Sequence, residues 1–367
     1  MKQDFVVSVS NLRKRFNLEA GFFARIGRYV HAVNGVSFSI AKNETYGLVG
    51  ESGCGKTTTA RLLVRMYRAD EGQILFKGRG DEAETDVMAL KGADLKRYRE
   101  KVKYVFQDPA RSLNPRMTVC EVLTSGAKWS KVRSGEGREK KRSAASLRDE
   151  AAAILEEVGL QAADLDRRPA EFSGGQRQRI SIARGLMMKP DLLICDEVVS
   201  ALDVSIQGQI LNLLYDLRSR REISFLFIAH DLKVASYFCD RIGVMYRGEI
   251  MEEAPATVLW KNRLHPYTEL LFSSVKHAGA AEMVMRTTPG NPAAPGHPAP
   301  GEAKSAVSEA LLYESESCAF SGRCPHAEDR CFREKPPLIE ESAGHFLRCW
   351  KRDLSETNHP EPNQAVG

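Results

Sequence analysis

The sequence predicts an α/β fold in which short apolar strands alternate with helices around a glycine-rich loop. Three observations lead to this expectation. Residues 45–49 have the composition of a short buried strand, and residues 58–66 that of a helix. Between them, residues 50–57 read Gly-Glu-Ser-Gly-Cys-Gly-Lys-Thr, which fits the pattern G-x-x-x-x-G-K-[ST]. Further apolar strands are predicted at 102–106, 192–197 and 223–229.

The residue types of this loop suit a phosphate ligand. Glycines let successive backbone N–H groups turn inward around an anion, and the next helix directs its N-terminus to the same point. We expect Lys56 to reach the β- and γ-phosphates of a nucleoside triphosphate and the Thr57 hydroxyl to hold Mg²⁺. The nucleotide-binding residues predicted here are Gly50, Glu51, Ser52, Gly53, Cys54, Gly55, Lys56, Thr57 and Thr58.

Composition narrows the class of protein. At 367 residues the chain is long for one domain, so we expect one large domain with an appendage. Its 53 basic and 48 acidic residues leave a net charge of +5, too small an excess to indicate nucleic-acid binding. No apolar run of about 18 residues occurs, and the first residues lack the apolar core of a signal peptide. We therefore expect a cytosolic protein whose eight cysteines do not form a disulfide framework.

Alternation of apolar and polar residues predicts three further strands, at 5–9, 36–40 and 73–76. They would form a small β-layer beside the loop. Phe16 and Tyr29 lie between the first two and are candidates for stacking on an adenine ring. Packing in the core or in a loop explains either aromatic side chain equally well.

The middle of the chain is predicted to be largely helical, over about 108–188. Within it, residues 128–148 are strongly basic, and we interpret them as a solvent-exposed insertion. Ser173 is placed to cap a helix at 177–188, whose dipole would point toward whatever lies in front of it.

Polar residues follow several of the predicted strands. Gln107 follows the strand at 102–106, the adjacent carboxylates Asp196 and Glu197 end the next, and His230 follows the strand at 223–229. Phosphoryl transfer depends on positioning and charge neutralisation more than on covalent chemistry, so these side chains suit such a reaction.

The order of these motifs resembles the nucleotide-binding subunit of ATP-binding-cassette (ABC) transporters over residues 1–270. The specific part of the match is Phe-Ser-Gly-Gly-Gln at 172–176, just ahead of a hydrophobic strand that ends in Asp-Glu. The resemblance implies a P-loop ABC ATPase core, with a RecA-like, mostly parallel sheet, an antiparallel β-subdomain and a helical subdomain. It also implies hydrolysis of ATP coupled to transport.

The resemblance assigns roles to individual residues. Asp196 would ligate Mg²⁺ directly or through water, Glu197 would polarise the attacking water, and His230 would contact the γ-phosphate. Gln107 would contact Mg²⁺ or water and relay the nucleotide state to a transmembrane partner. Ser173 and Gly175 would bind the γ-phosphate of ATP held by the opposite subunit. The implied catalytic residues are Lys56, Gln107, Glu197 and His230, and the implied nucleotide contacts outside the loop are Phe16, Ser173, Gly174, Gly175, Gln176 and Asp203.

Later stretches narrow the resemblance to the oligopeptide/dipeptide branch of importer ATPases, which includes nickel and glutathione systems. They are His-Pro-Tyr-Thr at 265–268 and Gly-Arg-Cys-Pro at 322–325, and Asn-Pro-Arg-Met at 114–117 agrees with them. Val198 departs from the branch, which usually has proline after the catalytic glutamate. Both carboxylates remain in place, so the hydrolytic interpretation is kept.

The C-terminal part is predicted to comprise a linker rich in Pro, Ala and Gly at 271–314, a Cys-rich extension at 315–352 and a tail at 353–367. The cysteines of the extension are Cys318, Cys324, Cys331 and Cys349. Four thiolates suit a metal centre. Structural zinc sites usually show tight C-x₂-C pairs, and wider spacings tolerate an iron–sulfur cluster, so iron–sulfur, zinc and free thiols all stay open. The resemblance implies a [4Fe–4S] cluster, because similar tails in this branch hold one.

The resemblance also implies an assembly that imports a peptide or a similar solute. The partners would be a second ATP-binding subunit (self or paralogue), two integral-membrane permease subunits and an extracytoplasmic solute-binding protein, with no nucleic acid. The chain would be peripheral, at the cytoplasmic face of the inner membrane. The alternatives are a soluble non-transport ABC ATPase acting on a cytosolic complex and a non-hydrolysing regulatory subunit. The solute is not predicted, since specificity lies in the permease and the binding protein.

Overall fold

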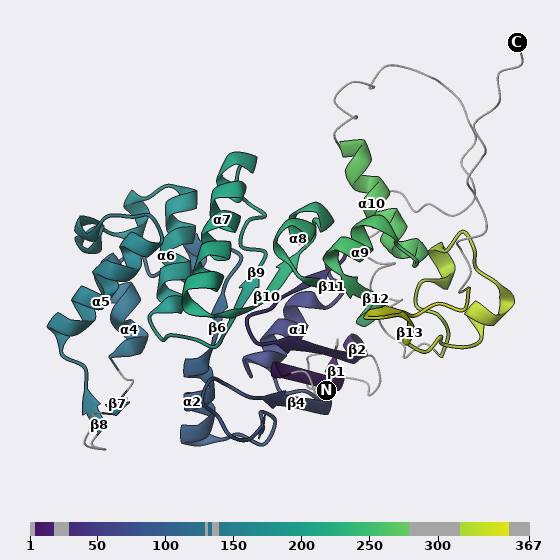
Figure 1. Ribbon diagram of the computed structural model, residues 1–367, viewed down its shortest axis with the longest axis horizontal. Coiled ribbons are helices and arrows are strands. Elements are labelled where there is room, and N and C mark those ends of the chain that lie inside the picture. Colours follow the sequence, from purple (N-terminus) through teal and green to yellow (C-terminus); the bar gives the residue numbers. More distant parts are fainter. Residues whose placement is uncertain (1–3, 18–28, 129–130, 134–138, 279–315, 352–367) are drawn as a thin grey trace, which may run out of the picture.

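The computed structural model describes residues 4–17, 29–128, 131–133, 139–278 and 316–351. Over these ranges the strands form an eight-stranded sheet, a four-stranded sheet and a two-stranded hairpin. Figure 1 shows the largest sheet in the middle of the molecule, between a group of helices at one end and the yellow C-terminal segment at the other. None of the helices in the described ranges is long and apolar enough to cross a bilayer.

The largest sheet has the strand order β13-β14-β12-β11-β3-β10-β9-β6. Its strands are β3 (Thr45–Val49), β6 (Val102–Val105), β9 (Leu192–Asp196), β10 (Ser224–Ala229), β11 (Arg241–Tyr246), β12 (Glu249–Pro255), β13 (Ile339–Ser342) and β14 (His345–Leu347). Strands β11, β3, β10, β9 and β6 run parallel, so their carboxyl ends meet at one edge. The strands predicted at 45–49, 102–106, 192–197 and 223–229 are confirmed to within one residue.

The parallel strands are apolar throughout because both faces of the sheet are covered. In β10, Phe225 and Phe227 join one buried cluster while Leu226 and Ile228 join the other. The first cluster includes residues of α7 (Val204–Arg221) and α8 (Leu232–Phe238). The second includes residues of α1 (Lys56–Leu63) and of the four-stranded sheet.

The four-stranded sheet has the order β2-β1-β4-β5 and is antiparallel. Its strands are β1 (Phe5–Asn17), β2 (Tyr29–Ala41), β4 (Glu71–Phe76) and β5 (Thr85–Asp86). The predicted β-layer is therefore confirmed, but β1 and β2 are each 13 residues long. Register shifts after Val9, Leu12 and Lys14 interrupt the alternation along β1, which is why the sequence pattern showed only its first part.

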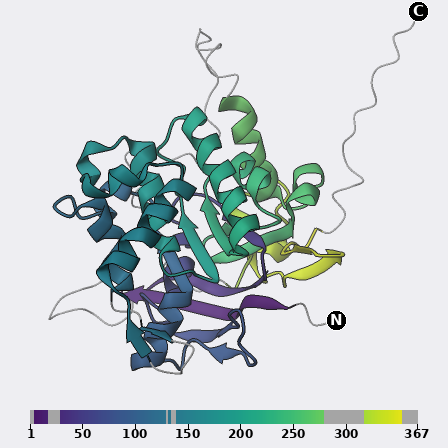
Figure 2. The same ribbon diagram turned by 60° about the vertical axis from the view of Figure 1, so that its left-hand side comes forward.

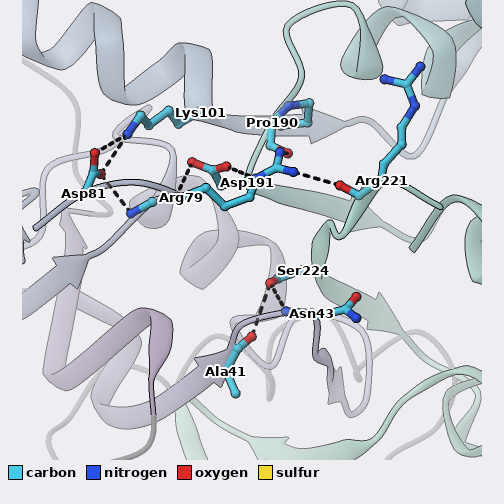
Figure 3. A network of polar contacts seen from close by, with 10 residues as sticks. Ala41, Asn43, Arg79, Asp81, Lys101, Pro190, Asp191, Arg221 and Ser224 are labelled. Carbon is cyan, nitrogen blue, oxygen red and sulfur yellow. Dashed lines mark hydrogen bonds and ion pairs between the residues drawn. The ribbon is translucent and has the colours of Figure 1, made fainter. Parts of the chain in front are cut away.

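Arg79 ties this antiparallel sheet to the amino ends of the parallel strands (Figure 3). Its guanidinium donates to Asp191 Oδ1 at 2.7 Å, to the Arg221 carbonyl at 2.9 Å and to the Pro190 carbonyl at 3.2 Å. Asp191 precedes β9, and Ser224 of the same network opens β10. This network occupies the amino-terminal edge of the sheet, which leaves the carboxyl edge for the site.

The chain between β4 and β9 is mainly helical outside β5 and β6. It contains α2 (Gly92–Lys101), α3 (Pro109–Ser112), α4 (Val119–Ala127), α5 (Ala144–Glu157) and α6 (Gly174–Leu186), with 3₁₀ turns η1 (Ala162–Asp166) and η2 (Pro169–Glu171). The region predicted helical over about 108–188 is thus largely helical. The basic stretch at 128–148, predicted to be a solvent-exposed insertion, includes the hairpin of β7 (Lys131–Arg133) and β8 (Glu139–Lys141) and the first turn of α5.

The C-terminal segment extends the main sheet instead of hanging from it as a separate appendage. It includes η3 (Ser321–Arg323), η4 (Asp329–Phe332), β13 and β14, and β14 pairs with β12 through Glu252–Leu347 and Glu253–Phe346. Figures 1 and 2 show it against the green end of the sheet, near α9 (Ala256–Lys261).

The linker predicted from 271 is wrong over 271–278, because α10 (Pro266–Ala278) continues through these residues. Residues 279–314 of the predicted linker, and the tail at 353–367, lie outside the described residues.

Candidate active site

The glycine-rich loop joins β3 to α1 at the carboxyl edge of the parallel strands. Two of its glycines are required by close approach of other backbone. A Cβ at Gly50 would lie 2.1 Å from the Met245 carbonyl oxygen, and one at Gly55 would lie 2.1 Å from that of Ala32. Gly55 also precedes α1 with a φ of 110°, a conformation that favours glycine. The loop therefore keeps its shape while Ser52 and Gly53 stay exposed.

Lys56 opens α1 and is buried under the loop, with only 4% of the residue exposed. Its ammonium donates to the carbonyl oxygens of Gly50, at 2.7 Å, and Glu51, at 2.9 Å. The positive charge thus lies within the loop predicted to bind phosphate. Thr58, the last residue of the predicted set, is half-buried in the first turn of α1.

Asp196 is the last residue of β9, and the structure brings it to Thr57. The Thr57 hydroxyl donates to Asp196 Oδ1 at 3.0 Å, and the Tyr104 hydroxyl donates to Oδ2. Burial, followed by the charge of Asp196, raises the pKa of Tyr104 well above its usual range. A hydroxyl and a carboxylate are ligands that suit Mg²⁺. Two of the three residues predicted to contact the metal, Thr57 and Asp196, are thus side by side, while the third, Gln107, contacts Glu197. Sequence reasoning missed Tyr104, whose only signal was a polar group within an apolar strand.

Glu197 follows Asp196 and contacts two further predicted residues. Gln107 Nε2 donates to Glu197 Oε2 at 2.7 Å, and His230 Nδ1 lies 4.0 Å from the same oxygen. The backbone of Glu197 has a φ of 49°, which is uncommon for a residue with a side chain. Its N–H donates to the Ile228 carbonyl at 3.0 Å, and Ser200 Oγ donates to its carbonyl at 2.9 Å. These bonds hold the turn and aim the carboxylate toward Gln107.

The Ser-Gly-Gly-Gln turn at 173–176 begins α6 as predicted, one turn earlier than the expected helix at 177–188. Gln176 N–H donates to Ser173 Oγ at 3.3 Å, and Ser173 N–H donates to Gln176 Oε1 at 2.9 Å, forming a capping box. A Cβ at Gly175 would lie 2.7 Å from the Ile206 side chain, so this turn packs beside the start of α7, which Asp203 precedes. Ser173 itself is exposed.

Comparisons with known proteins agree with these features. The chain matches the ABC transporter family over residues 33–200 and the C-terminal region of oligopeptide/dipeptide transporters over 251–331. The oligopeptide transport ATP-binding protein AppF of Bacillus subtilis is 39% identical, over 95% of this chain and 97% of its own. The chain belongs to the ABC transporter family. A probable peptide ABC transporter ATP-binding protein of Sinorhizobium fredii, y4tS, is also 39% identical, over 98% of this chain and 94% of its own.

Solved structures support the same conclusion. The dimeric ATP-binding cassette MJ0796 bound to ADP and Pi superposes with a TM-score of 0.56 at 25% identity, covering 68% of this chain and 98% of that one. CbiO1 from Clostridium perfringens superposes with a TM-score of 0.58 at 22% identity over 76% of this chain, and supports the fold alone. The ABC ATPase fold and the family predicted from the sequence are confirmed, and this ABC ATPase couples ATP hydrolysis to transport.

The two aromatic candidates for adenine stacking lie on paired strands of this ABC ATPase. Phe16 in β1 packs edge-on against Tyr67, with ring centroids 5.3 Å apart, and faces the Lys14 ammonium at 5.4 Å. Tyr29, at the start of β2, is exposed and has the Arg15 guanidinium 5.7 Å from its ring. A role for Phe16 at the nucleotide stays a prediction.

The loop is also held by residues from the C-terminal part of the ABC ATPase, which sequence reasoning missed. Arg323 donates two hydrogen bonds to the Glu51 carboxylate, at 2.8 and 2.9 Å, and the Glu51 N–H donates to the Tyr267 hydroxyl at 3.0 Å. Both Arg323 and Tyr267 lie in stretches that had served only as markers of the oligopeptide/dipeptide branch.

The four cysteines of the C-terminal segment lie near one another. Burial raises the pKa of the Cys349 thiol to about 11, and the charges of Cys318, Cys324 and Cys331 act in the same direction. The Cys318 N–H also donates to the Cys331 carbonyl at 2.9 Å. Even so, in the part of the chain that the structure describes, no group of three or more His, Cys, Asp or Glu side chains is arranged to hold a metal ion. The four thiols therefore lie near one another, but they are not arranged as the ligands of one metal ion.

Proposed function

We propose that this ABC ATPase powers the import of peptides or a related solute. Support comes from relatives named as peptide and oligopeptide transport proteins and from the match of residues 251–331 to the oligopeptide/dipeptide transporter C-terminal region. The assembly would contain a second ATP-binding subunit, identical or paralogous, and two permease subunits, with an extracytoplasmic solute-binding protein. The chain would lie at the cytoplasmic face of the inner membrane. The soluble non-transport alternative is not favoured by these relatives.

The observation that carries the ATP-hydrolysing part of this proposal is the polar cluster at the carboxyl edge of the sheet. Thr57 and Asp196 offer a hydroxyl and a carboxylate oxygen 3.0 Å apart, which fits Mg²⁺. When bound, Mg²⁺ would neutralise charge on the β- and γ-phosphates. Lys56 would contribute a second positive charge to the same phosphates from beneath the loop.

Glu197 would act as the general base. Its Oε2 accepts from Gln107 Nε2, so the carboxylate is held in place while its second oxygen can accept a proton from the attacking water. His230, 4.0 Å from the same oxygen, would contact the γ-phosphate. Gln107 would sense the nucleotide through Glu197 or Mg²⁺ and pass that state to the permease.

The turn at 173–176 would complete the site of the opposite subunit. Ser173 is exposed and begins a helix, whose N-terminus and glycine N–H groups suit a terminal phosphate. Gly174, Gly175 and Gln176 would share this contact, and Asp203 would lie near it at the start of α7. Two such sites would then form when two ATPase subunits close on two ATP molecules.

We also propose that the Cys-rich segment holds a [4Fe–4S] cluster on the four cysteines. The fit rests on donor chemistry: four soft thiol ligands lie near one another on one segment. These thiols would cross-link the segment around η3 and η4, which is a structural role. We further propose that the nucleotide-binding domain spans 1–270 and the extension 315–352.

Uptake of radiolabelled trialanine and pentaalanine by cells tests the transport function. Deletion of the gene should lower ATP-dependent uptake, and the wild-type gene should restore it while a Glu197→Gln gene should not. Peptide uptake that is unchanged by the deletion would contradict the proposal. Recovery of the chain in a complex with integral membrane proteins would separate it from a soluble ABC ATPase.

A further inference from the structure

The phosphate-binding loop is clamped by a residue 272 positions further along the chain. Arg323 forms a two-pronged pair with Glu51, the second residue of the loop, at 2.8 and 2.9 Å. A planar guanidinium matches a carboxylate in this way, whereas a lysine ammonium cannot. Tyr267 accepts a hydrogen bond from the Glu51 N–H at 3.0 Å, so the side chain and the backbone of Glu51 are both held.

Aromatic side chains hold Arg323 in position beside Glu51. The Arg323 guanidinium lies 5.7 Å from the Tyr246 ring centroid and 5.8 Å from that of Phe320, within the range of cation–π attraction. Phe320 is 1% exposed and packs against Tyr246 and Tyr267 at 5.3 and 5.4 Å. Arg323 is thus positioned by η3, by the Tyr246 ring of the main sheet and by the Phe320 ring, which the Tyr267 ring of α10 supports in turn.

We infer that Arg323 is a positioning residue for the phosphate loop, through which the C-terminal segment sets the affinity for nucleotide. Two physical effects support this. Arg323 neutralises a carboxylate that would otherwise repel the negative phosphates. It also restricts a loop whose glycines allow many conformations. The loop therefore loses less conformational entropy when the nucleotide binds. The inference rests on the proposed phosphate-binding role of the loop.

The effect should appear in binding more than in chemistry. Arg323 contacts the loop and not Glu197, so its loss should weaken binding of the nucleotide equally in the ground state and in the transition state. KM should therefore rise while kcat stays nearly unchanged. The pair is well exposed, with 42% and 40% of the two side chains accessible, so its effect on overall stability should be small. Loss of affinity and loss of folding can therefore be distinguished.

The test measures binding of MgATPγS to the full-length chain by calorimetry, and the KM and kcat for MgATP. We expect R323A to raise the Kd and the KM about tenfold, which corresponds to a loss of about 1.4 kcal/mol in binding free energy. The kcat of R323A should stay within about twofold of wild type. R323K should fall between wild type and R323A. Adding E51Q to R323A should restore most of the affinity, because the unpaired carboxylate is then removed.

A matched control is the Arg148–Asp166 pair, which is also two-pronged and exposed but lies in the helical region. R148A should leave Kd, KM and kcat unchanged. The inference is overturned if R323A binds nucleotide within twofold of wild type, if R148A weakens binding as much, or if E51Q does not relieve the defect of R323A. If K56A binds nucleotide as well as wild type, the proposed phosphate site itself is wrong, and the inference falls with it.

Discussion

Replacement of Glu197 by glutamine tests whether its carboxylate is the base of the ATPase reaction. Glutamine has nearly the same size, and its side-chain oxygen can still accept from Gln107 Nε2, which lies 2.7 Å from Glu197 Oε2. The backbone bonds of Glu197 to Ile228 and Ser200 do not involve the side chain, so the turn should keep its shape. E197Q therefore removes basicity and changes little else.

The size of the effect follows from the role. General-base catalysis contributes about 10²- to 10⁴-fold, so kcat should fall by that factor. At about 1.36 kcal/mol per tenfold, this is about 2.7 to 5.4 kcal/mol in the activation barrier. The affinity for MgATP should stay within about threefold, because the loop and Lys56 are untouched. Slow hydrolysis with intact binding should trap a closed dimer.

Phosphate release measures kcat, equilibrium dialysis measures ATP binding, and gel filtration with ATP measures the dimer. E156Q is the control, since Glu156 is an exposed glutamate on α5 and its loss should leave kcat unchanged. A kcat for E197Q within about tenfold of wild type would refute the assignment of Glu197 as the base. Loss of ATP binding in the same variant would instead indicate a damaged site.

Three further predictions concern other parts of the molecule. Cys54 is 6% exposed and burial raises its pKa above the ordinary value of 9.0, so its reactive thiolate is scarce at neutral pH. Inactivation by iodoacetamide should accelerate about tenfold per pH unit from pH 7 to 8.5 and be slowed by ATP, while equal inactivation of C54A would place the sensitive thiol elsewhere. Mixing inactive E197Q and S173R chains should restore part of the ATPase activity. In a mixed dimer one of the two sites then carries both defects, and the other site carries neither and can hydrolyse ATP. No recovery on mixing, together with no activation by a candidate paralogue, would contradict action of Ser173 across the dimer. Protein purified without oxygen should absorb broadly at about 400 nm and contain about four irons per chain. Stoichiometric zinc without iron would contradict the cluster on Cys318, Cys324, Cys331 and Cys349.

The motifs of the nucleotide site were largely predictable from the sequence because each motif is a run of contiguous residues. The strand, loop and helix from 45 to 66 form one local unit, and the capping box at Ser173 is set by residues three apart. Asp196 and Glu197 end an apolar strand, and parallel strands bring their carboxyl ends to one edge. Strand-end positions together with the family resemblance indicated these residues as one site, and the contacts of Thr57 with Asp196 and of Gln107 with Glu197 agree.

What the sequence alone did not predict depends on contacts between distant segments. β1 and β2 were predicted too short, since bulges break the alternation and only pairing along the ribbon reveals their length. Tyr104 meets Asp196 because β6 lies beside β9, although the two residues are 92 positions apart.

The C-terminal segment is the clearest case. Glu252 is fully buried in β12, where its carboxylate accepts from the backbone N–H groups of Leu264 and His265 and lies 2.7 Å from His345 Nε2 in β14. A buried carboxylate is tolerated only with such partners, and they come from two separate segments, at 264–265 and in β14. The composition of residues 315–352 indicated only cysteine chemistry. Tertiary packing decided that these residues extend the main sheet and bring Arg323 to the phosphate loop, because hydrogen bonds across 272 positions leave no periodic pattern in the sequence.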